Sequence, residues 1–185
     1  MRRLTVAGLL AILPIGLALA AVACKRTANH SESGSVPGAT PELLSVVAMD
    51  DPRAAIQLVR GFYSPEGGPW RWTAGQFSVI LRPPPGSAAQ DGARLEVNLN
   101  IPDVVFQQLG AMTLSVTAAG IPLMPEKYTE PGNHIYTRDV PASALAGDSA
   151  TFEFATDKMI PAGKLEKREL ALIVTSIGLV SKAPN

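Results

Sequence analysis

Apolar and polar residues alternate along most of the chain after Gly75. The alternating positions fall in five segments: Phe77 to Leu81, Leu95 to Leu99, Met112 to Val116, Phe152 to Phe154 and Leu170 to Val174. A period of two places every second side chain on the same face of a β-strand, so each segment predicts a strand. The last segment is apolar at both parities, which is typical of a central strand covered on both faces.

Turn residues separate these segments at short intervals. They are Pro83-Pro84-Pro85-Gly86, Asp91-Gly92, Ala119-Gly120, Pro131-Gly132-Asn133 and Ala146-Gly147-Asp148. Short strands with frequent turns predict a mostly β fold, a single antiparallel β-sandwich or jelly roll, over residues 61–182. We expect His134, which follows one of these signals, on a turn.

Residues 41–60 carry helix-start signals instead. Thr40-Pro41-Glu42 combines an N-cap residue, a first-turn proline and a carboxylate, and it predicts one short helix through about Ala48. Asp51-Pro52 repeats the signal, but periodicity leaves residues 53–60 as either helix or extended chain. This region is therefore a short helical or extended lead-in to the β domain.

The first residues have the layout of an export signal. Arg2 and Arg3 precede an uncharged, mostly apolar run from Leu4 to Val22, and the run ends in Ala21-Val22-Ala23-Cys24. The last four residues resemble a bacterial lipobox, which implies a lipoprotein signal peptide over residues 1–23 and lipidation of Cys24. An uncleaved membrane anchor is the alternative, although Pro14 and Gly16 disfavour a spanning helix. Both interpretations place the rest of the chain outside the cytoplasm.

Residues 24–40 predict a flexible tether after the lipidated cysteine. The segment is rich in Ser, Gly, Ala, Asn and Thr and holds almost no large apolar residue. Lys25 stands where an aspartate retains some bacterial lipoproteins at the inner membrane, which favours the outer membrane or cell surface. The membrane is thus the first expected partner, through Cys24.

Composition excludes several classes of function. The chain has 16 basic and 16 acidic residues, one cysteine and two histidines. Even charge argues against a nucleic-acid partner, and one cysteine excludes a disulfide framework or a cysteine-rich metal site. We find no phosphate loop, dinucleotide fingerprint or nucleophile elbow, and we expect no cofactor, no metal and no enzymatic activity. A glycosidase pair among Glu66, Glu153 and Asp157 stays open, because the sequence does not give their separation.

One segment concentrates aromatic and charged residues. Between Gly61 and Thr73 lie Tyr63, Glu66, Trp70, Arg71 and Trp72, including both tryptophans of the chain. Aromatic faces beside a guanidinium and a carboxylate are suited to bind sugars, because rings pack on C–H groups while charged groups take hydroxyls. The alternative is a structural loop in which a tryptophan plugs one end of the sandwich.

A second charged cluster precedes the last apolar segment. It consists of Asp157-Lys158 and of Glu166-Lys167-Arg168-Glu169. Such charges usually form a solvated strand edge or an ion-pair network. We hypothesise that Arg168 or Glu169 pairs with Glu66 or Arg71, which would add Arg168 to the candidate ligand-binding residues.

These residues, taken in order, resemble a known module. Gly61-Phe62-Tyr63-x-x-Glu66, Trp70-Arg71-Trp72-Thr73, Asp157-Lys158 and Arg168-Glu169-Leu170 are similar to motifs of a β-sandwich module of bacterial cell-envelope proteins, often attached to glycosyltransferases. The resemblance covers about residues 61–179. Glu166 and Ala171 depart from the module's aspartate and glycine. The resemblance implies a β-sandwich in a carbohydrate setting, without catalysis.

Two functions follow as expectations. The first is a non-enzymatic, lipid-anchored β-sandwich that binds glycan or glycolipid at the cell envelope through Tyr63, Glu66, Trp70, Arg71, Trp72 and Arg168. The second is a structural or interaction lipoprotein that docks on another envelope protein. Solvent exposure of the two tryptophans discriminates between them.

Overall fold

The computed structural model describes residues 42–163 and 166–182. Its strands are β1 (Val46–Ala48), β2 (Leu58–Phe62), β3 (Arg71–Leu81), β4 (Ala93–Ile101), β5 (Met112–Ala118), β6 (Ile121–Pro122), β7 (Glu126–Tyr128), β8 (Gly132–Val140), β9 (Ala150–Thr156) and β10 (Ile173–Ser181). Its short helices are η1 (Pro52–Ile56), α1 (Ala88–Asp91), α2 (Asp103–Leu109) and η2 (Ala142–Leu145). The predicted signal peptide (1–23) and the tether with Cys24 (24–40) lie outside the described residues.

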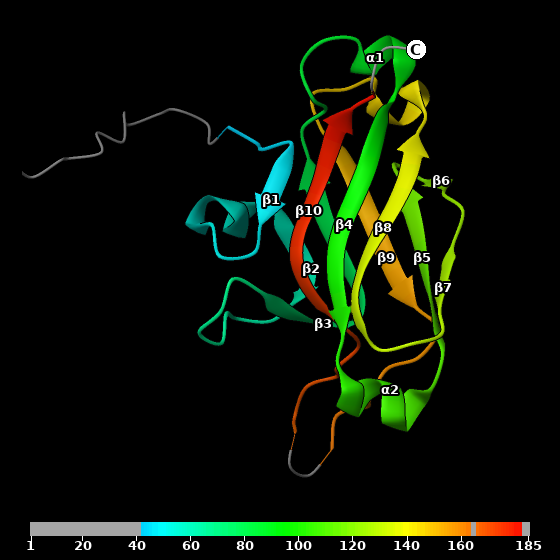
Figure 1. The fold of residues 1–185 in the computed structure, drawn as a ribbon. Helices are drawn as coiled ribbons and strands as arrows, with labels where there is room; N and C mark the ends of the chain where they lie inside the picture. Colours follow the sequence, from blue (N-terminus) through cyan, green and yellow to red (C-terminus); the bar gives the residue numbers. More distant parts are fainter. Residues whose placement is uncertain (1–41, 164–165, 183–185) are drawn as a thin grey trace, which may run out of the picture. The chain divides into compact units, whose positions relative to one another are not determined.

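The strands form one antiparallel sheet that curls into two layers (Figure 1). One layer, which we call the β10 layer, has the strand order β8-β4-β10-β1. The other, the β9 layer, has the order β2-β3-β9-β5, and both β6 and β7 pair with β5. The layers join where Ile173 and Val174 of β10 pair with Trp72 and Arg71 of β3. The predicted antiparallel β-sandwich is confirmed.

Many of the core side chains are ones that the two-residue period predicted to point inward. Phe77 of β3 stacks on Phe154 of β9 with ring centroids 4.7 Å apart. Leu95 and Val97 of β4 are fully buried in the same apolar cluster. Burying each large side chain contributes about 1.5–3 kcal/mol. The alternation therefore located β3, β4, β5 and β9 correctly.

The helix predicted from Thr40 to Ala48 is wrong over its described part. Val46–Ala48 form β1, and these three residues pair with the Ser176–Gly178 segment of β10. Pairing buries Val47, and a single helical turn is costly to nucleate, so the tertiary contact prevails over the local capping signal. The second signal does start a helical turn: the Asp51 side chain accepts a hydrogen bond from the backbone N–H of Arg53 at the start of η1.

A buried amide fixes the start of the domain. Gln57 is fully buried, and its Oε1 accepts a hydrogen bond from the N–H of Leu44 at 2.8 Å. Its Nε2 donates to the carbonyl oxygens of Leu44 (3.0 Å) and Ile80 (2.7 Å). The side chain thus satisfies the backbone of Leu44 as a neighbouring strand would, and it ties that residue to β3.

His134 lies in a strand and not on the predicted turn. It belongs to β8, which pairs with β4 along its whole length. Only Tyr136 and Val140 of β8 are buried, so its apolar positions are too sparse for the alternation to be recognised. Tyr136 Oη and Arg138 Nε both donate to the carbonyl oxygen of Met124 at 2.9 Å, which closes this edge of the sheet with side chains. Burial raises the pKa of Tyr136 to about 12, so its hydroxyl remains a donor.

Candidate functional site

The aromatic segment forms the connection between β2 and β3. Gly61, just before it, has φ +75°, and a Cβ at this position would lie 2.1 Å from the carbonyl oxygen of Gln76. The pairing register of β2 with β3 shifts between Leu58 and Arg60 and again between Arg60 and Phe62, the interval that contains Gly61. A glycine is therefore required for β2 to bend here and release the chain into the loop.

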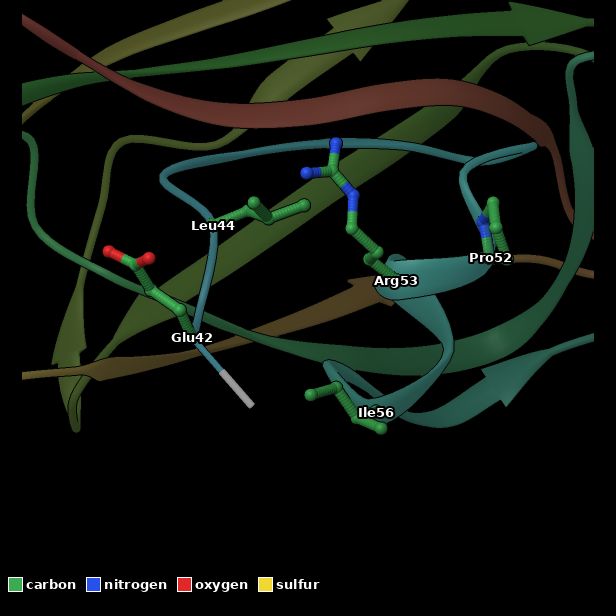
Figure 2. Close-up of a pocket in the computed structure, with 5 residues that line it drawn as sticks. All are labelled: Glu42, Leu44, Pro52, Arg53 and Ile56. Atoms are coloured by element: carbon green, nitrogen blue, oxygen red, sulfur yellow. The ribbon is translucent and has the colours of Figure 1, made fainter. Parts of the chain in front are cut away.

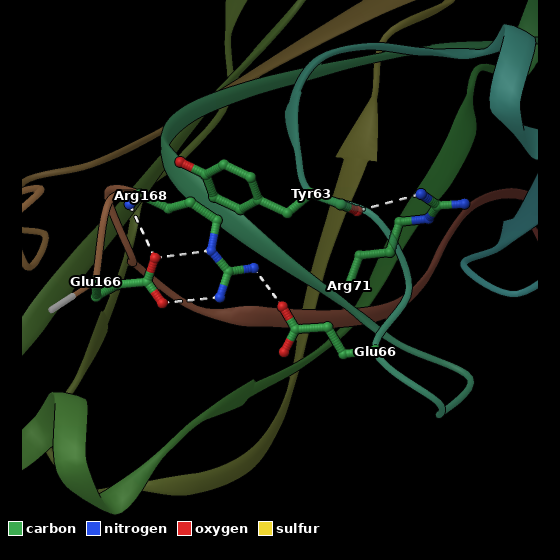
Figure 3. A network of polar contacts seen from close by, with 5 residues as sticks. All are labelled: Tyr63, Glu66, Arg71, Glu166 and Arg168. Atoms are coloured by element: carbon green, nitrogen blue, oxygen red, sulfur yellow. Dashed lines mark hydrogen bonds and ion pairs between the residues drawn. The ribbon is translucent and has the colours of Figure 1, made fainter.

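Arg168 is the centre of a charged cluster at this loop (Figure 3). Its Nε and Nη2 donate to the two carboxylate oxygens of Glu166, each at 2.9 Å. Its Nη1 donates to Glu66 of the loop. The predicted pairing of Arg168 with Glu66 is confirmed, and the pair joins two segments that are 102 residues apart in the sequence.

The same guanidinium covers an aromatic ring. Arg168 Cζ lies 5.1 Å from the centroid of the Tyr63 ring. The hydrogen bonds from Arg168 lower the pKa of Glu166 to about 2, and those from Arg168 to Glu166 and Glu66 raise the pKa of the guanidinium. Glu166 is therefore charged at every physiological pH. Tyr63, Glu66, Glu166 and Arg168, which we call the Arg168 cluster, form a partly exposed patch of two carboxylates and one guanidinium on a tyrosine face.

Arg71 belongs to the scaffold of the loop. Its Nε donates to the carbonyl oxygen of Met49 at 2.8 Å, and its Nη1 donates to the carbonyl oxygen of Tyr63 at 3.2 Å. Figure 3 shows its guanidinium pointing away from Arg168. Arg71 thus holds the first residue of the loop in place, whereas the residues that present charge to solvent are Glu66, Glu166 and Arg168.

The two tryptophans are both half-buried and have different surroundings. Trp72 packs against the apolar core, near the point where β3 meets β10. Trp70 covers Gly68 closely, since a Cβ on Gly68 would lie 2.1 Å from its Nε1. Trp72 therefore supports the sandwich, and Trp70 is the tryptophan that shapes the loop surface.

A second polar surface lies on the outer face of the β9 layer. One depression of about 220 Å³ is lined by Arg60, Gln76, Ser115, Thr117, Glu153, Phe154 and Ala155. Another, of about 480 Å³, is lined by Gly75, Gln76, Thr156, Asp157, Met159 and Glu169. Gln76 lines both, and we call the two together the β9-layer groove. Gln76, Ser115 and Thr117 are not among the residues predicted from the sequence to bind a ligand, because their only signal is that each points outward between buried residues of its strand.

The three carboxylates considered for glycoside hydrolysis have separate partners. Glu66 pairs with Arg168, and Glu153 pairs with Arg60 at 3.2 Å. Asp157 Oδ1 accepts a hydrogen bond from the N–H of Thr113 at 2.6 Å. Among residues 42–163 and 166–182, no group of three or more histidine, cysteine, aspartate or glutamate side chains is arranged to hold a metal ion.

A third surface feature lies where the described chain begins. Leu44, Pro52 and Ile56 line a mostly apolar depression of about 340 Å³, with Glu42 and Arg53 at its sides (Figure 2). Ile56 is 55% exposed, and Val59 of the edge strand β2 is 53% exposed. This surface differs from the other two in offering apolar side chains to a partner.

Taken together, fold and site define an antiparallel β-sandwich with polar surfaces on one loop and on one layer. No helix in the described part of the chain is long and apolar enough to cross a membrane. No family model matches the chain, and no curated protein matches it. Among solved structures, the chain is similar to the CBM36-1 domain of a multidomain xylanase from the hindgut metagenome of Trinervitermes trinervoides. The identity is 11% and the TM-score 0.39, over 76% of this chain and 98% of that domain.

Proposed function

We propose that this chain is a non-enzymatic lipoprotein, anchored through lipidated Cys24 outside the cytoplasm, that binds glycan or glycolipid at the cell envelope. The carrying observation is the Arg168 cluster, in which the guanidinium lies over the face of Tyr63 and pairs with the carboxylates of Glu66 and Glu166. Carboxylates fixed in this way accept hydrogen bonds from pairs of sugar hydroxyls. The half-buried indole of Trp70, on the same loop, supplies a face for C–H groups of a sugar ring.

The cluster is organised before any ligand arrives. Glu166 meets Arg168 through two parallel hydrogen bonds, and Arg71 fixes the backbone at Tyr63. A site whose side chains are already held in place loses less conformational entropy on binding. This pre-organisation favours recognition by Tyr63, Glu66, Trp70 and Arg168, with Arg71 and Trp72 as supports.

Acrylamide quenching of tryptophan fluorescence tests the proposal. The full chain is studied in a detergent without a sugar headgroup, with hexamers of N-acetylglucosamine, glucosamine and galacturonate and a lipopolysaccharide core oligosaccharide as probes. We expect one glycan to protect the tryptophans from quenching. The substitution Glu66→Gln should lower the affinity for that glycan about three- to tenfold, because a charged hydrogen bond is lost. Glu130→Gln, on another exposed loop, is the matched control. Unchanged quenching with every probe would overturn the proposal.

The anchor is tested separately from the ligand. Mass spectrometry of the mature protein from a bacterial membrane fraction should find a lipidated Cys24 as the first residue. Cys24→Ser should release the chain from the membrane, because the acyl chains provide the durable attachment. An unprocessed N-terminus would support the spanning-anchor alternative.

A second function is favoured by the apolar surface of Figure 2. Ile56 of this surface is exposed, and the exposed Val59 belongs to the edge strand β2 that follows, where a partner can add a strand or an apolar side chain. This surface supports a lipoprotein that docks on another envelope protein. Val59→Lys should abolish such docking and leave glycan binding intact, which separates the two functions.

A further inference from the structure

The smaller depression of the β9-layer groove is built from strand register, whereas the larger one also includes Asp157, Met159 and Glu169 from the connection between β9 and β10. Arg60 of β2, Ser78 of β3, Glu153 of β9 and Thr117 of β5 lie opposite one another across four strands. Arg60 and Glu153 form an ion pair at 3.2 Å that passes over β3 at Ser78. The Ser78 side chain beneath this pair is only 2% exposed. The polar side chains of the smaller depression are therefore held at fixed spacings by the sheet.

The two depressions of the groove follow one another along β9. The smaller one includes Glu153, the larger one includes Asp157, and Gln76 of the neighbouring strand lines both. Four residues of a strand span about 13 Å. The larger depression, about 480 Å³, also falls in the usual range of about 300–1,000 Å³ for small-molecule sites. The groove thus fits an elongated ligand better than a single compact one.

The lining favours hydroxyl groups and disfavours anions. Gln76, Ser115 and Thr117 provide neutral donors and acceptors, and Met159 adds an apolar side chain that is 39% exposed. The charged residues that line the groove are three acidic ones, Glu153, Asp157 and Glu169, and one basic one, Arg60. An amine-bearing ligand is attracted by this balance, and a carboxylate-bearing ligand is repelled.

We infer that the β9-layer groove binds an extended, unbranched chain of neutral or amino sugars. The inference rests on the proposed function for the class of ligand, but it assigns a site distinct from the Arg168 cluster. Several sugar units lie along β9 from Glu153 to Asp157, the residue that follows the strand, and Gln76 bonds the unit where the two depressions meet. The aromatic residue that lines the groove, Phe154, is only 2% exposed, so the surface offered to a ligand is mainly polar, which favours the sugar chain over the apolar core of a protein interface.

Isothermal titration of the full chain with the glucosamine hexamer tests this inference. The variant is Gln76→Ala, and Gln107→Ala on the exposed helix α2 is its matched control, because it makes the same chemical change away from the groove. Ser115→Tyr fills the smaller depression without touching the core, and thermal unfolding of each variant verifies its fold. Glu66→Gln reports on the Arg168 cluster in parallel.

We expect the hexamer to bind at least tenfold more tightly than glucosamine monomer, and galacturonate hexamer to compete poorly. Gln76→Ala should lower the affinity for the hexamer about three- to tenfold, and Ser115→Tyr should lower it at least as much. Gln107→Ala should leave the affinity unchanged. This result supports the inference whatever Glu66→Gln does.

Three results would overturn the inference. Binding that is lost in Glu66→Gln and kept in Gln76→Ala places the glycan at the Arg168 cluster, and the proposed function stands without the groove. Equal binding of hexalysine shows that only the negative charge attracts the probe. Absence of binding by any sugar hexamer removes the groove, and the proposed function falls with it only if the lipopolysaccharide core oligosaccharide also leaves the tryptophan quenching unchanged.

Discussion

The loop between β2 and β3 is fixed by an arginine on each side, and the two arginines have different partners. Arg71 donates to the backbone carbonyl oxygens of Met49 and Tyr63. Arg168 donates to the carboxylates of Glu166 and Glu66, whose side chains are 39% and 40% exposed. A carbonyl oxygen that loses its donor inside the protein has no substitute, whereas water readily replaces the partner of an exposed carboxylate. The Arg71 side is therefore structural, and the Arg168 side is available to a ligand.

The largest expected effect is at the glycine that starts the loop. Gly61→Ala should destabilise the domain by about 3–5 kcal/mol, because it adds backbone strain at φ +75° and a clash with the Gln76 carbonyl. Gly67→Ala is the matched control: Gly67 has φ +84° with no atom within 4 Å of the added Cβ, and its cost should be about 1 kcal/mol. Urea unfolding of both variants measures the difference. Equal costs would mean that the close approach at Gly61 contributes nothing.

The next effect distinguishes the two arginines. Arg71→Met should cost about 1–3 kcal/mol, because the half-buried carbonyls of Met49 and Tyr63 lose their donors. Arg71→Lys should recover part of this loss, since the ammonium still donates. Arg168→Gln should cost less than about 1 kcal/mol, as exposed ion pairs do. A larger loss for Arg168→Gln than for Arg71→Met in urea unfolding would reverse the comparison.

The smallest effect on stability is the pH dependence of the Arg168 cluster. The pKa of Glu166 is lowered from 4.5 to about 2, so the stabilisation by its charge is complete above about pH 4.5 and is lost as the pH falls toward 2. In Arg168→Gln, the pKa of Glu166 should return toward 4.5. Carboxyl-carbon NMR titration of both proteins measures this shift. If the pKa of Glu166 remained near 2 in Arg168→Gln, a group other than Arg168 would be responsible for lowering it.

The sequence predicted those features that depend on neighbours in one strand. Alternation located the strands around Phe77 and Leu95, because each residue's burial follows from its parity. The pairing of Arg168 with Glu66 was one of the predicted alternatives, because Arg168 lies directly before an apolar segment, where a charge that points inward needs a partner.

The features that the sequence did not predict depend on distant backbone. The helix signal at Thr40-Pro41-Glu42 is lost because β10 offers Val46–Ala48 a strand partner. The last strand begins at Ile173 and not at Leu170, because Leu170 forms an isolated bridge with Ile160. Arg71 was assigned to the ligand in the sequence, but its partners are carbonyl oxygens, which every residue carries and no pattern reveals.

Gln57 gives the domain a mechanical property. Its amide bonds the backbone of Leu44, two residues after the first described residue, and the carbonyl of Ile80 in β3. Tension applied to the chain ahead of Glu42 therefore reaches these three bonds before it reaches the pairing of β1 with β10. The hydrogen bonds of this amide must break before β1 can separate from β10. A domain pulled from its N-terminal side would resist that pull through this buried amide together with the hydrogen bond from the N–H of Arg82 to the carbonyl oxygen of Leu44.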